Sequence, residues 1–178
     1  MKKHLRKKAL AKRNALTLEY REKSSLKIFE KLISMSEYKS AETVLLYASF
    51  GSEVDTEMLI KRALKDKKTV CLPRCIKESR QMEIVPIKSL DDLKEGAYGI
   101  KEPVGNGISD ADLVIVPLVA FTKEKDRLGY GGGYYDRFLA NADTKSIGIA
   151  FSCQIEENVY PENTDIKLQK IVTEKEVY

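Results

Sequence analysis

A glycine-rich segment carries the most specific chemistry in this sequence. Its residues are Arg127-Leu128-Gly129-Tyr130-Gly131-Gly132-Gly133-Tyr134-Tyr135-Asp136-Arg137. Glycines lack side chains and tolerate positive φ, so their backbone N–H groups can approach an anion closely. Arg127 and Arg137 flank the loop as candidate phosphate ligands, and Asp136 is the nearest carboxylate that could hold a bridging Mg²⁺. The segment therefore favours phosphate binding over a purely structural turn.

The standard nucleotide-binding motifs do not fit this segment. A P-loop requires Gly-Lys-Ser/Thr where Tyr134, Tyr135 and Asp136 stand. The dinucleotide-binding fingerprint requires a third glycine at the position of Tyr134, and the kinase-type loop fails for the same reason. The predicted phosphate site is therefore of another kind.

Histidine and cysteine usage excludes several classes of chemistry. His4 is the only histidine, and the three cysteines, Cys71, Cys75 and Cys153, have no metal-ligand spacing. This pattern argues against a disulfide framework and against a zinc site. It also excludes Ser-His-Asp and Cys-His catalysis, unless His4 served as the base.

The N-terminal segment is strongly basic. The net charge is +4, and seven cations precede the first acid, Glu19: Lys2, Lys3, Arg6, Lys7, Lys8, Lys12 and Arg13. They are consistent with nucleic-acid binding, with phosphate ligands for a small anionic molecule, or with a solvated helix face. Charge alone leaves these three interpretations open.

The predicted elements make up one α/β domain spanning residues 1–178. Apolar spacing indicates helices within 2–38, with Ser24 as a candidate cap, and further helices over 55–65 and 135–141. Strands are expected over 43–50, 69–72, 82–87, 112–121, 146–151 and 170–173, and a long loop over 96–110. The apolar run 113–117 is typical of a strand buried on both faces. Strands alternating with helices favour a mostly parallel sheet with helices on both sides.

Composition indicates an ordinary globular protein. The chain has 178 residues, of which 43% are hydrophobic and 33% charged, which suits a single domain with a real core. No apolar run approaches the roughly 20 residues that cross a bilayer. None follows the basic N-terminus as in a secretory signal. We expect a cytoplasmic protein without a membrane partner.

The string RLGYGGGYYDRFL resembles the signature of the 5-formyltetrahydrofolate cyclo-ligase family, also called 5,10-methenyltetrahydrofolate synthetases. Further segments match in the same order over nearly the whole chain. They are Lys2-Lys3-His4-Leu5-Arg6, residues 49–56, Leu72-Pro73-Arg74, residues 98–103 and Gly148-Ile149-Ala150. The glycine-rich string is specific by itself, and the other segments support it in combination.

The resemblance implies a three-layer α/β/α sandwich with a mostly parallel sheet, related to phosphosugar isomerases and CoA-transferases. It implies ATP- and Mg²⁺-dependent conversion of 5-formyltetrahydrofolate to 5,10-methenyltetrahydrofolate, with release of ADP and phosphate through an iminophosphate. The partner is then this small folate, with no nucleic acid, and the protein is a monomer. Such an enzyme positions a phosphoryl group and neutralises its charge, and it needs no covalent nucleophile.

The same resemblance assigns the site residues. ATP is bound by Lys2, Lys3, Arg6, Arg127, Leu128, Gly129, Tyr130, Gly131, Gly132, Gly133, Tyr134 and Tyr135. The folate is bound by Ala48, Phe50, Glu53, Tyr130, Gly131, Gly132, Gly133 and Tyr134. Asp136 ligates Mg²⁺, and the catalytic set is Arg127, Tyr135 and Asp136.

Three positions depart from the family pattern. Thr122 and Lys125 stand where Asp and Gly are usual in the approach to the glycine-rich segment, and we expect little effect. Gln169 stands where a second magnesium-associated carboxylate is expected, and Asp165 is a candidate substitute. The alternatives are a non-catalytic nucleotide- or RNA-binding module and a phosphosugar-isomerase-like enzyme on the same fold.

Overall fold

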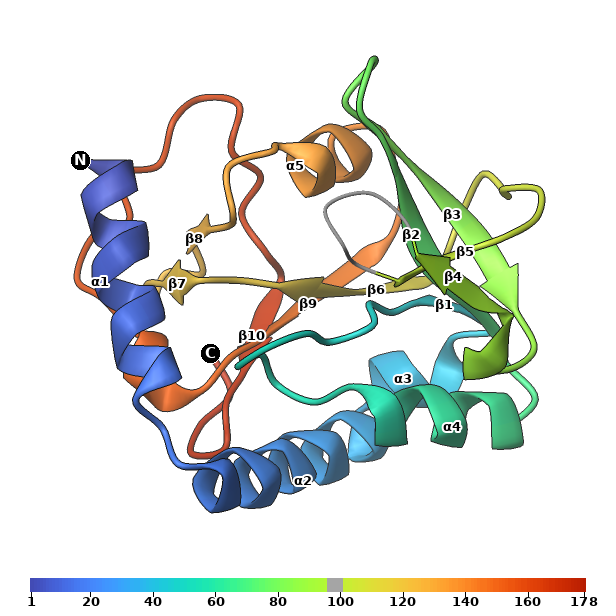
Figure 1. Ribbon diagram of the computed structural model, residues 1–178, viewed down its shortest axis with the longest axis horizontal. Helices are drawn as coiled ribbons and strands as arrows, with labels where there is room; N and C mark the ends of the chain where they lie inside the picture. Colours follow the sequence, from blue (N-terminus) through green and yellow to red (C-terminus); the bar gives the residue numbers. More distant parts are fainter. Residues whose placement is uncertain (96–100) are drawn as a thin grey trace.

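The computed structural model describes residues 1–95 and 101–178 and is built around a six-stranded sheet (Figure 1). The strands are β1 Thr43–Leu45, β2 Thr69–Ile76, β3 Gln81–Ile87, β6 Leu113–Pro117, β9 Lys145–Ile149 and β10 Lys170–Val172. They lie in the order β10-β9-β6-β1-β2-β3. Neighbours run parallel except in the antiparallel hairpin β2–β3. The predicted mostly parallel sheet is confirmed.

Two small antiparallel sheets accompany the main one. β4 (Leu93–Glu95) pairs with β5 (Lys101–Pro103), and β7 (Ala120–Phe121) pairs with β8 (Arg127–Leu128). β5 falls inside the predicted loop 96–110, so that part of the prediction is wrong. The short run of Lys101–Pro103 between glycine-rich stretches gives no strand signal of its own, and only its pairing with β4 makes it a strand.

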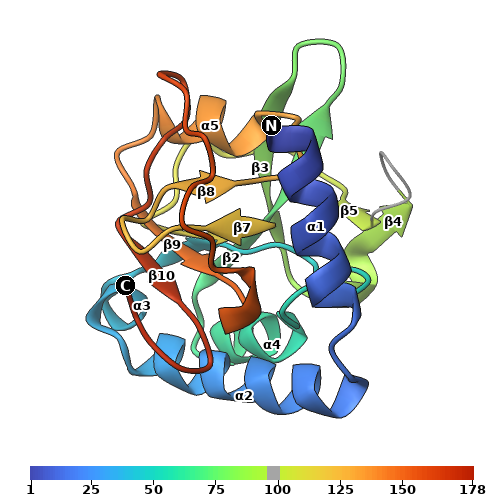
Figure 2. The same ribbon diagram turned by 90° about the vertical axis from the view of Figure 1, so that its left-hand side faces the viewer.

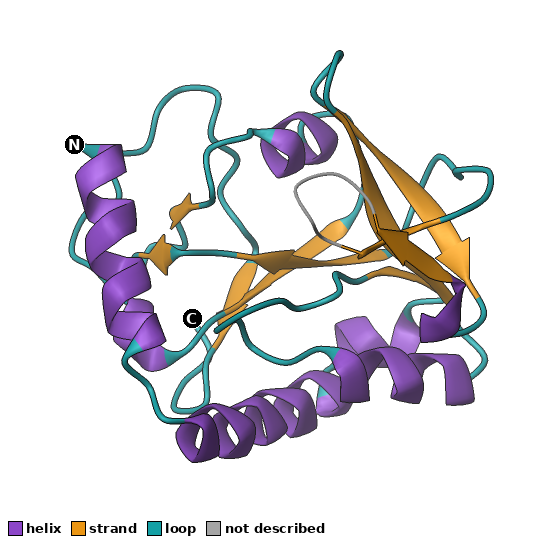
Figure 3. Cartoon of the chain, in the orientation of Figure 1, coloured by secondary structure: helices purple, strands orange, loops and turns teal. Residues whose placement is uncertain are grey.

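Helices cover both faces of the main sheet (Figure 3). The longer ones are α1 Lys2–Asn14, α2 Leu18–Ser34 and α4 Glu57–Lys65, and the shorter ones are α3 Ser36–Ser40, α5 Tyr134–Leu139, η1 Leu90–Asp92 and η3 Ser152–Gln154. α2, α3 and α4 pack on one face, and α5 packs on the other. This arrangement confirms the predicted α/β class with helices on both sides. Among the described residues, no helix is both long and apolar enough to cross a membrane.

Alternating apolar side chains explain why the central strands are buried on both faces. In β6, Leu113 and Ile115 point into the core beneath α2 and α4, whereas Val114 and Val116 point into the core beside α5. All four are almost completely buried. A strand with two buried faces needs apolar residues at every position, so the prediction for residues 113–117 is confirmed.

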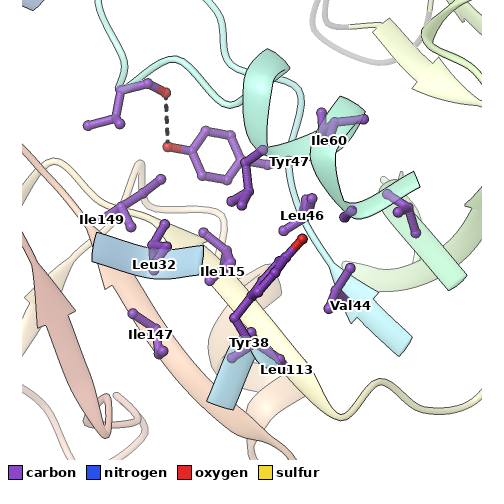
Figure 4. Close-up of a cluster of buried hydrophobic side chains, with 14 of the residues drawn as sticks. Leu32, Tyr38, Val44, Leu46, Tyr47, Ile60, Leu113, Ile115, Ile147 and Ile149 are labelled. Atoms are coloured by element: carbon purple, nitrogen blue, oxygen red, sulfur yellow. Dashed lines mark hydrogen bonds between the residues drawn. The ribbon is translucent and has the colours of Figure 1, made fainter. Parts of the chain in front are cut away.

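The larger core joins the sheet to α2, α3 and α4 (Figure 4). Leu32, Tyr38 and Ile60 come from the three helices and meet Leu46 and Ile147 from the sheet side. In the same cluster the hydroxyl of Tyr47 donates to the carbonyl of Val54 at 3.4 Å. This bond ties the segment after β1 to the start of α4, and that segment carries several candidate site residues.

Helix α1 has an apolar cluster of its own outside the main sheet. Leu5 and Ala9 pack against Val119, Ala120 and Leu128. Figure 2 shows α1 lying across β7 and β8, with its N-terminus towards the segment between β8 and α5. The packing of this basic helix therefore brings Arg6 and Arg13 to the glycine-rich loop.

A predicted helix cap and a predicted strand end are wrong for local reasons. Thr17 rather than Ser24 caps α2, because its hydroxyl accepts the N–H of Tyr20, while Ser24 is buried inside the helix. The predicted strand 43–50 ends at Leu45. Beyond it the hydroxyl of Thr56 donates to the carbonyl of Tyr47 and accepts the N–H of Ser49 at 3.1 Å. A side chain thus takes over the backbone hydrogen bonds that a longer strand would need.

Gly148 provides a test of the packing between β9 and its neighbours. A Cβ atom there would lie 2.5 Å from Leu118 and 2.6 Å from Leu168, both of which are buried. We expect Gly148→Ala to lower the free energy of unfolding by about 1–3 kcal/mol, because the added methyl group overpacks the core. Urea denaturation measures this change. Gly107→Ala is the matched control, because its Cβ would make only ordinary contacts at 3.5 Å. Equal stability of the two variants would contradict this account.

Candidate active site

A cavity of about 780 Å³ opens where strands β1 and β6 end. Tyr47 and Ala48 follow β1, and Pro117 is the last residue of β6. The chain leaves β1 for β2 on one side and later returns to β6 on the other. In open α/β sheets this switch point, at the carboxyl ends of the strands, is the usual place for a ligand.

The cavity unites nearly all the predicted site residues. Its walls contain Lys2, Arg6, Tyr47, Ala48, Phe50, Glu53, Leu72, Pro73, Cys75, Met82, Lys101, Glu102, Pro117, Arg127, Leu128, Gly129, Tyr130, Gly131, Gly132, Gly133, Tyr134, Tyr135, Asp136, Glu162 and Asp165. Of the residues that the resemblance assigns to ATP, folate and Mg²⁺, Lys3 alone is not among them, and it is exposed on α1. Residues 98–100 of the family-like segment 98–103 lie outside the described residues.

Three arginines hold the glycine-rich loop from outside. Arg6 donates from Nε to the carbonyl of Gly129 at 2.7 Å, and Arg137 donates from Nη2 to the carbonyl of Gly132 at 2.9 Å. Arg13 donates from Nη2 to the hydroxyl of Tyr130 at 3.0 Å. Because glycines supply no anchoring side chains, these bonds fix the shape of the loop before a ligand arrives.

Two positions of the loop favour glycine because of their backbone conformation and their close neighbours. Gly131 and Gly133 have positive φ, 104° and 68°. A Cβ on Gly131 would lie 3.3 Å from the guanidinium carbon of Arg6, and one on Gly133 would lie 2.6 Å from Nη1 of Arg137. Backbone conformation and close approach both exclude larger residues here.

Arg127 and Asp136 form an ion pair in the wall of the cavity. Arg127 donates from Nη2 to Oδ1 of Asp136 at 2.8 Å, and its side chain is only 4% exposed. Its Nη1 donates to the carbonyl of Ile166, whose own N–H donates to Oδ1 of Asp136 at 3.0 Å. The structure thus turns Arg127 towards protein acceptors. Within the described residues, Arg137, which we predicted as a phosphate ligand, donates to the carbonyls of Gly132 and Arg80, and it does not line the cavity.

Lys2 closes the cavity against the segment before β10. Its Nζ lies 2.6 Å from Oδ2 of Asp165 and 3.0 Å from Oε1 of Glu162. Burial alone would lower the pKa of Lys2, but the hydrogen bonds to both carboxylates outweigh it and raise the pKa. Burial would raise the pKa of Asp165, but the bond from Lys2 outweighs it and lowers the pKa. Both groups are therefore charged at neutral pH.

Glu53 is a buried carboxylate in the wall of the cavity, with 7% of its surface exposed. It accepts the hydroxyl of Tyr130 at 2.5 Å and the N–H of Phe50 at 3.1 Å. Burial raises the pKa of Glu53. The rings of Phe50 and Tyr130 lie 5.8 Å apart, so an aromatic wall adjoins the carboxylate.

Tyr135 contributes an unsatisfied polar group. Its hydroxyl is buried and has no hydrogen-bond partner within residues 1–95 and 101–178, although its residue lines the cavity. Burial raises the pKa of Tyr135 and also raises that of Cys75, to about 11. A buried hydroxyl without a partner is uncommon in folded proteins, so a bound ligand is the natural acceptor for it.

The carboxylates around the cavity could hold a metal ion only together with the phosphates of a bound ligand. The described chain has no group of three or more His, Cys, Asp or Glu side chains that could hold a metal ion alone. Mg²⁺ is commonly held by one or two carboxylates together with phosphates and water, and Asp136 and Asp165 both line the cavity. Gln169 does not line it, since its side-chain oxygen accepts the N–H of Ser146 at 3.3 Å.

Sequence reasoning missed Lys101, Glu102 and Glu162 in the walls of the cavity, and Arg13 behind it. Glu102 accepts the N–H of Cys75 at 3.1 Å, which attaches β5 to β2. The match of residues 98–103 to the family segment was the only available signal for Glu102. Arg13 and Glu162 lie among other charged residues of the sequence, and nothing in the spacing singles them out.

The fold and the cavity define an α/β enzyme whose active site lies at the carboxyl edge of a mostly parallel sheet. The model of the 5-formyltetrahydrofolate cyclo-ligase family matches residues 1–174. The chain therefore belongs to this family of ligases, as its glycine-rich string predicted. The family match does not favour a nucleic-acid-binding module or a phosphosugar isomerase.

Known proteins support the assignment. The chain is 32% identical to the 5-formyltetrahydrofolate cyclo-ligase of Haemophilus influenzae, over 88% of this chain and 89% of that protein. The NMR structure of Aquifex aeolicus 5,10-methenyltetrahydrofolate synthetase has a TM-score of 0.87 and 39% identity, covering 99% of this chain and 91% of that one. A 5,10-methenyltetrahydrofolate synthetase from Mycoplasma pneumoniae has a TM-score of 0.79 and 26% identity, covering 97% and 98% of the two chains.

Gly133 provides a test of the loop geometry. We expect Gly133→Ala to lower the free energy of unfolding by about 1–2 kcal/mol, because an L-residue is strained at positive φ and would displace Arg137. Thermal and urea unfolding measure this effect. Gly129→Ala is the matched control for stability, since nothing lies within 4 Å of its Cβ position. A Gly133→Ala variant as stable as Gly129→Ala would show that the left-handed turn is not required.

Proposed function

We propose that this protein cyclises 5-formyltetrahydrofolate to 5,10-methenyltetrahydrofolate, using ATP and Mg²⁺ and releasing ADP and phosphate. The observation that carries the proposal is a single cavity lined by two chemically different groups of residues. Lys2 and Arg6 from α1 lie with the glycine-rich loop in a part that we call the cationic side, and the same cavity is lined by the buried carboxylate of Glu53. Such a cavity suits two substrates held side by side, a polyphosphate and a folate.

ATP would occupy the cationic side. Lys2 and Arg6 line it, and the backbone of residues 129–133 offers a concave surface without side chains apart from Tyr130. Arg6 reaches this loop already in the absence of ligand, through its bond to Gly129. Lys3 is exposed on α1, and its predicted contact with ATP would require the lysine side chain to bend round the helix end.

Mg²⁺ would bind between the phosphates and Asp136, with Asp165 as the second carboxylate. Both acids adjoin Ile166, since Asp136 accepts its N–H and Asp165 precedes it in the chain. Arg127 is a positioning residue in this account, because its bond to Oδ1 fixes the orientation of Asp136. Lys2 bonds Asp165, so it would orient this second carboxylate while its remaining N–H groups face the phosphates.

The folate would occupy the side with Glu53. A carboxylate with fixed orientation pairs with the adjacent N–H and NH₂ donors of an aminopyrimidine ring, because both are donors and it is acceptor only. Ala48, Phe50, Tyr130 and Tyr134 would enclose the pterin, and Leu72 and Met82 add apolar surface. The folate would thereby point its formyl group towards the loop.

ATP supplies the phosphoryl group that turns the formyl oxygen into a leaving group, after which the second folate nitrogen closes the ring and phosphate departs. The protein's part is to hold both substrates in line, exclude water and neutralise charge. The unpartnered hydroxyl of Tyr135 would donate to an oxygen of the bound substrates. Its raised pKa keeps it protonated and suited to donation.

Further expectations accompany the proposal. We propose that residues 1–178 act as one domain, since Lys2 and Asp165 complete the cavity from regions far apart in sequence. Activity as a monomer stays a prediction. The cytoplasmic location and the absence of nucleic-acid partners stay predictions.

The direct test is an assay of ring closure. Purified protein mixed with Mg-ATP and 5-formyltetrahydrofolate should produce the near-ultraviolet absorbance of the methenyl product, with one phosphate released per product. Omission of ATP or Mg²⁺ should abolish the signal. A well-folded protein that binds ATP but forms no methenyl product would overturn the proposal.

The metal assignment has its own test. Asp136→Asn and Asp165→Asn should each raise the Mg²⁺ concentration for half-maximal activity by about 10- to 100-fold, the usual effect of changes around a metal site. Asp136→Asn also weakens the pairing of a buried arginine, so circular dichroism must show that the variant is folded. Asp126→Asn is the matched control, because Asp126 pairs with Lys167 away from the cavity. An unchanged Mg²⁺ requirement in both site variants would refute the assignment.

A further inference from the structure

Arg13 is a buried cation that lies behind the cavity rather than in its wall. It lies in the last turn of α1, and only 4% of its surface is exposed. Its Nε donates to the hydroxyl of Ser52 at 2.9 Å, and its Nη2 donates to the hydroxyl of Tyr130 at 3.0 Å. The guanidinium also lies 5.8 Å from the centre of the Tyr130 ring. A buried arginine requires hydrogen-bond acceptors of this kind.

These contacts form a directed chain of hydrogen bonds into the active site. Arg13 donates to the hydroxyl of Tyr130, and that hydroxyl donates to Oε1 of Glu53. The second carboxylate oxygen accepts the N–H of Phe50. Because a guanidinium can only donate and an ionised carboxylate can only accept, the Tyr130 hydroxyl accepts from Arg13 and donates to Glu53. The hydroxyl therefore links the buried cation to the carboxylate.

Arg13 is also the cation that compensates the charge of Glu53. The other titratable groups that face Glu53 are Tyr130, Tyr47 from the segment after β1, and Tyr135 from α5, and all three are neutral phenols. Burial raises the pKa of Glu53, while the bonds from Tyr130 and Phe50 and the charge of Arg13 lower it. A buried carboxylate needs such a partner to remain ionised.

We propose that Arg13 is a positioning residue for the folate, acting through Tyr130 to hold Glu53 ionised and correctly oriented. The inference rests on the proposed function, in which Glu53 receives the pterin ring. It adds a residue that touches neither substrate. It also gives the two ends of α1 separate tasks, with Lys2 and Arg6 serving the phosphates and Arg13 serving the folate.

The test compares Arg13→Gln with Arg13→Lys. Arg13→Gln removes the charge, so we expect KM for 5-formyltetrahydrofolate to rise by about tenfold or more, as for loss of a hydrogen bond to a charged group. KM for ATP should change by less than about twofold. The fold-change in kcat should be smaller than the fold-change in KM for the folate. Arg13→Lys keeps the charge and should restore part of the folate affinity. Lys7→Gln is the matched control, since Lys7 is exposed on the same helix outside the cavity.

A pH profile separates this role from a merely structural one. Loss of the nearby positive charge raises the pKa of Glu53, so protonation should abolish folate binding at higher pH in Arg13→Gln than in the wild type. The acidic limb of the profile of 1/KM for the folate should therefore move to higher pH in Arg13→Gln and stay in place in Arg13→Lys and Lys7→Gln. Displacement of α1 would instead raise KM for ATP as well, because Lys2 and Arg6 lie on it.

Tyr130→Phe keeps the ring and removes the relaying hydroxyl. If Arg13 acts through this hydroxyl, adding Arg13→Gln to Tyr130→Phe should change the folate KM by much less than it does in the wild type. Full additivity of the two substitutions, or an Arg13→Gln variant with unchanged folate KM and pH profile, would overturn the inference. Failure of the wild-type protein to form methenyltetrahydrofolate would instead refute the proposed function, so the two outcomes are distinguishable.

Discussion

A loop made of glycines has no side chains with which to fix its own shape, and this constraint governs the architecture of the site. The loop of residues 129–133 is held by guanidinium groups that bond its carbonyls and the hydroxyl of Tyr130. Arg6 and Arg13 come from α1, and Arg137 comes from α5. Both helices must therefore be positioned accurately before the loop can bind a ligand, and the apolar clusters beneath them do this.

The small cluster under α1 is consequently as important for function as the two main cores. Leu5 and Ala9 fix the helix against β7 and β8, and the strand β8 leads directly into the glycine-rich loop. The same packing that buries these apolar side chains sets the distance from Arg6 to Gly129. On the other side, the loop after β1 owes its shape to Thr56, whose hydroxyl replaces the missing strand bonds. Glu53 and Phe50 depend on that loop for their positions.

The sequence predicted the fold class and the glycine-rich loop well, because apolar alternation and glycine content are local signals. Nearly every residue that the family resemblance assigned to the site lies in the wall of the cavity. Arg13 could not be distinguished from Lys12 in this way, since both are cations in one basic run. Adjacent residues on a helix point about 100° apart, and only the docking of α1 buries Arg13 while Lys12 stays at the surface with Glu156. The resemblance expects a magnesium-associated carboxylate where Gln169 stands, and the Gln169 side chain bonds the N–H of Ser146 outside the cavity.

The bond between Lys2 and Asp165 joins residues 163 positions apart, and this has a consequence for biosynthesis. A chain emerging from the ribosome contains α1 long before Asp165 is translated. Until then the helix lacks this acidic neighbour, and closing the long loop between the two residues carries an entropic cost. The wall of the cavity beside Lys2 can therefore form only after five of the six strands of the main sheet have been translated.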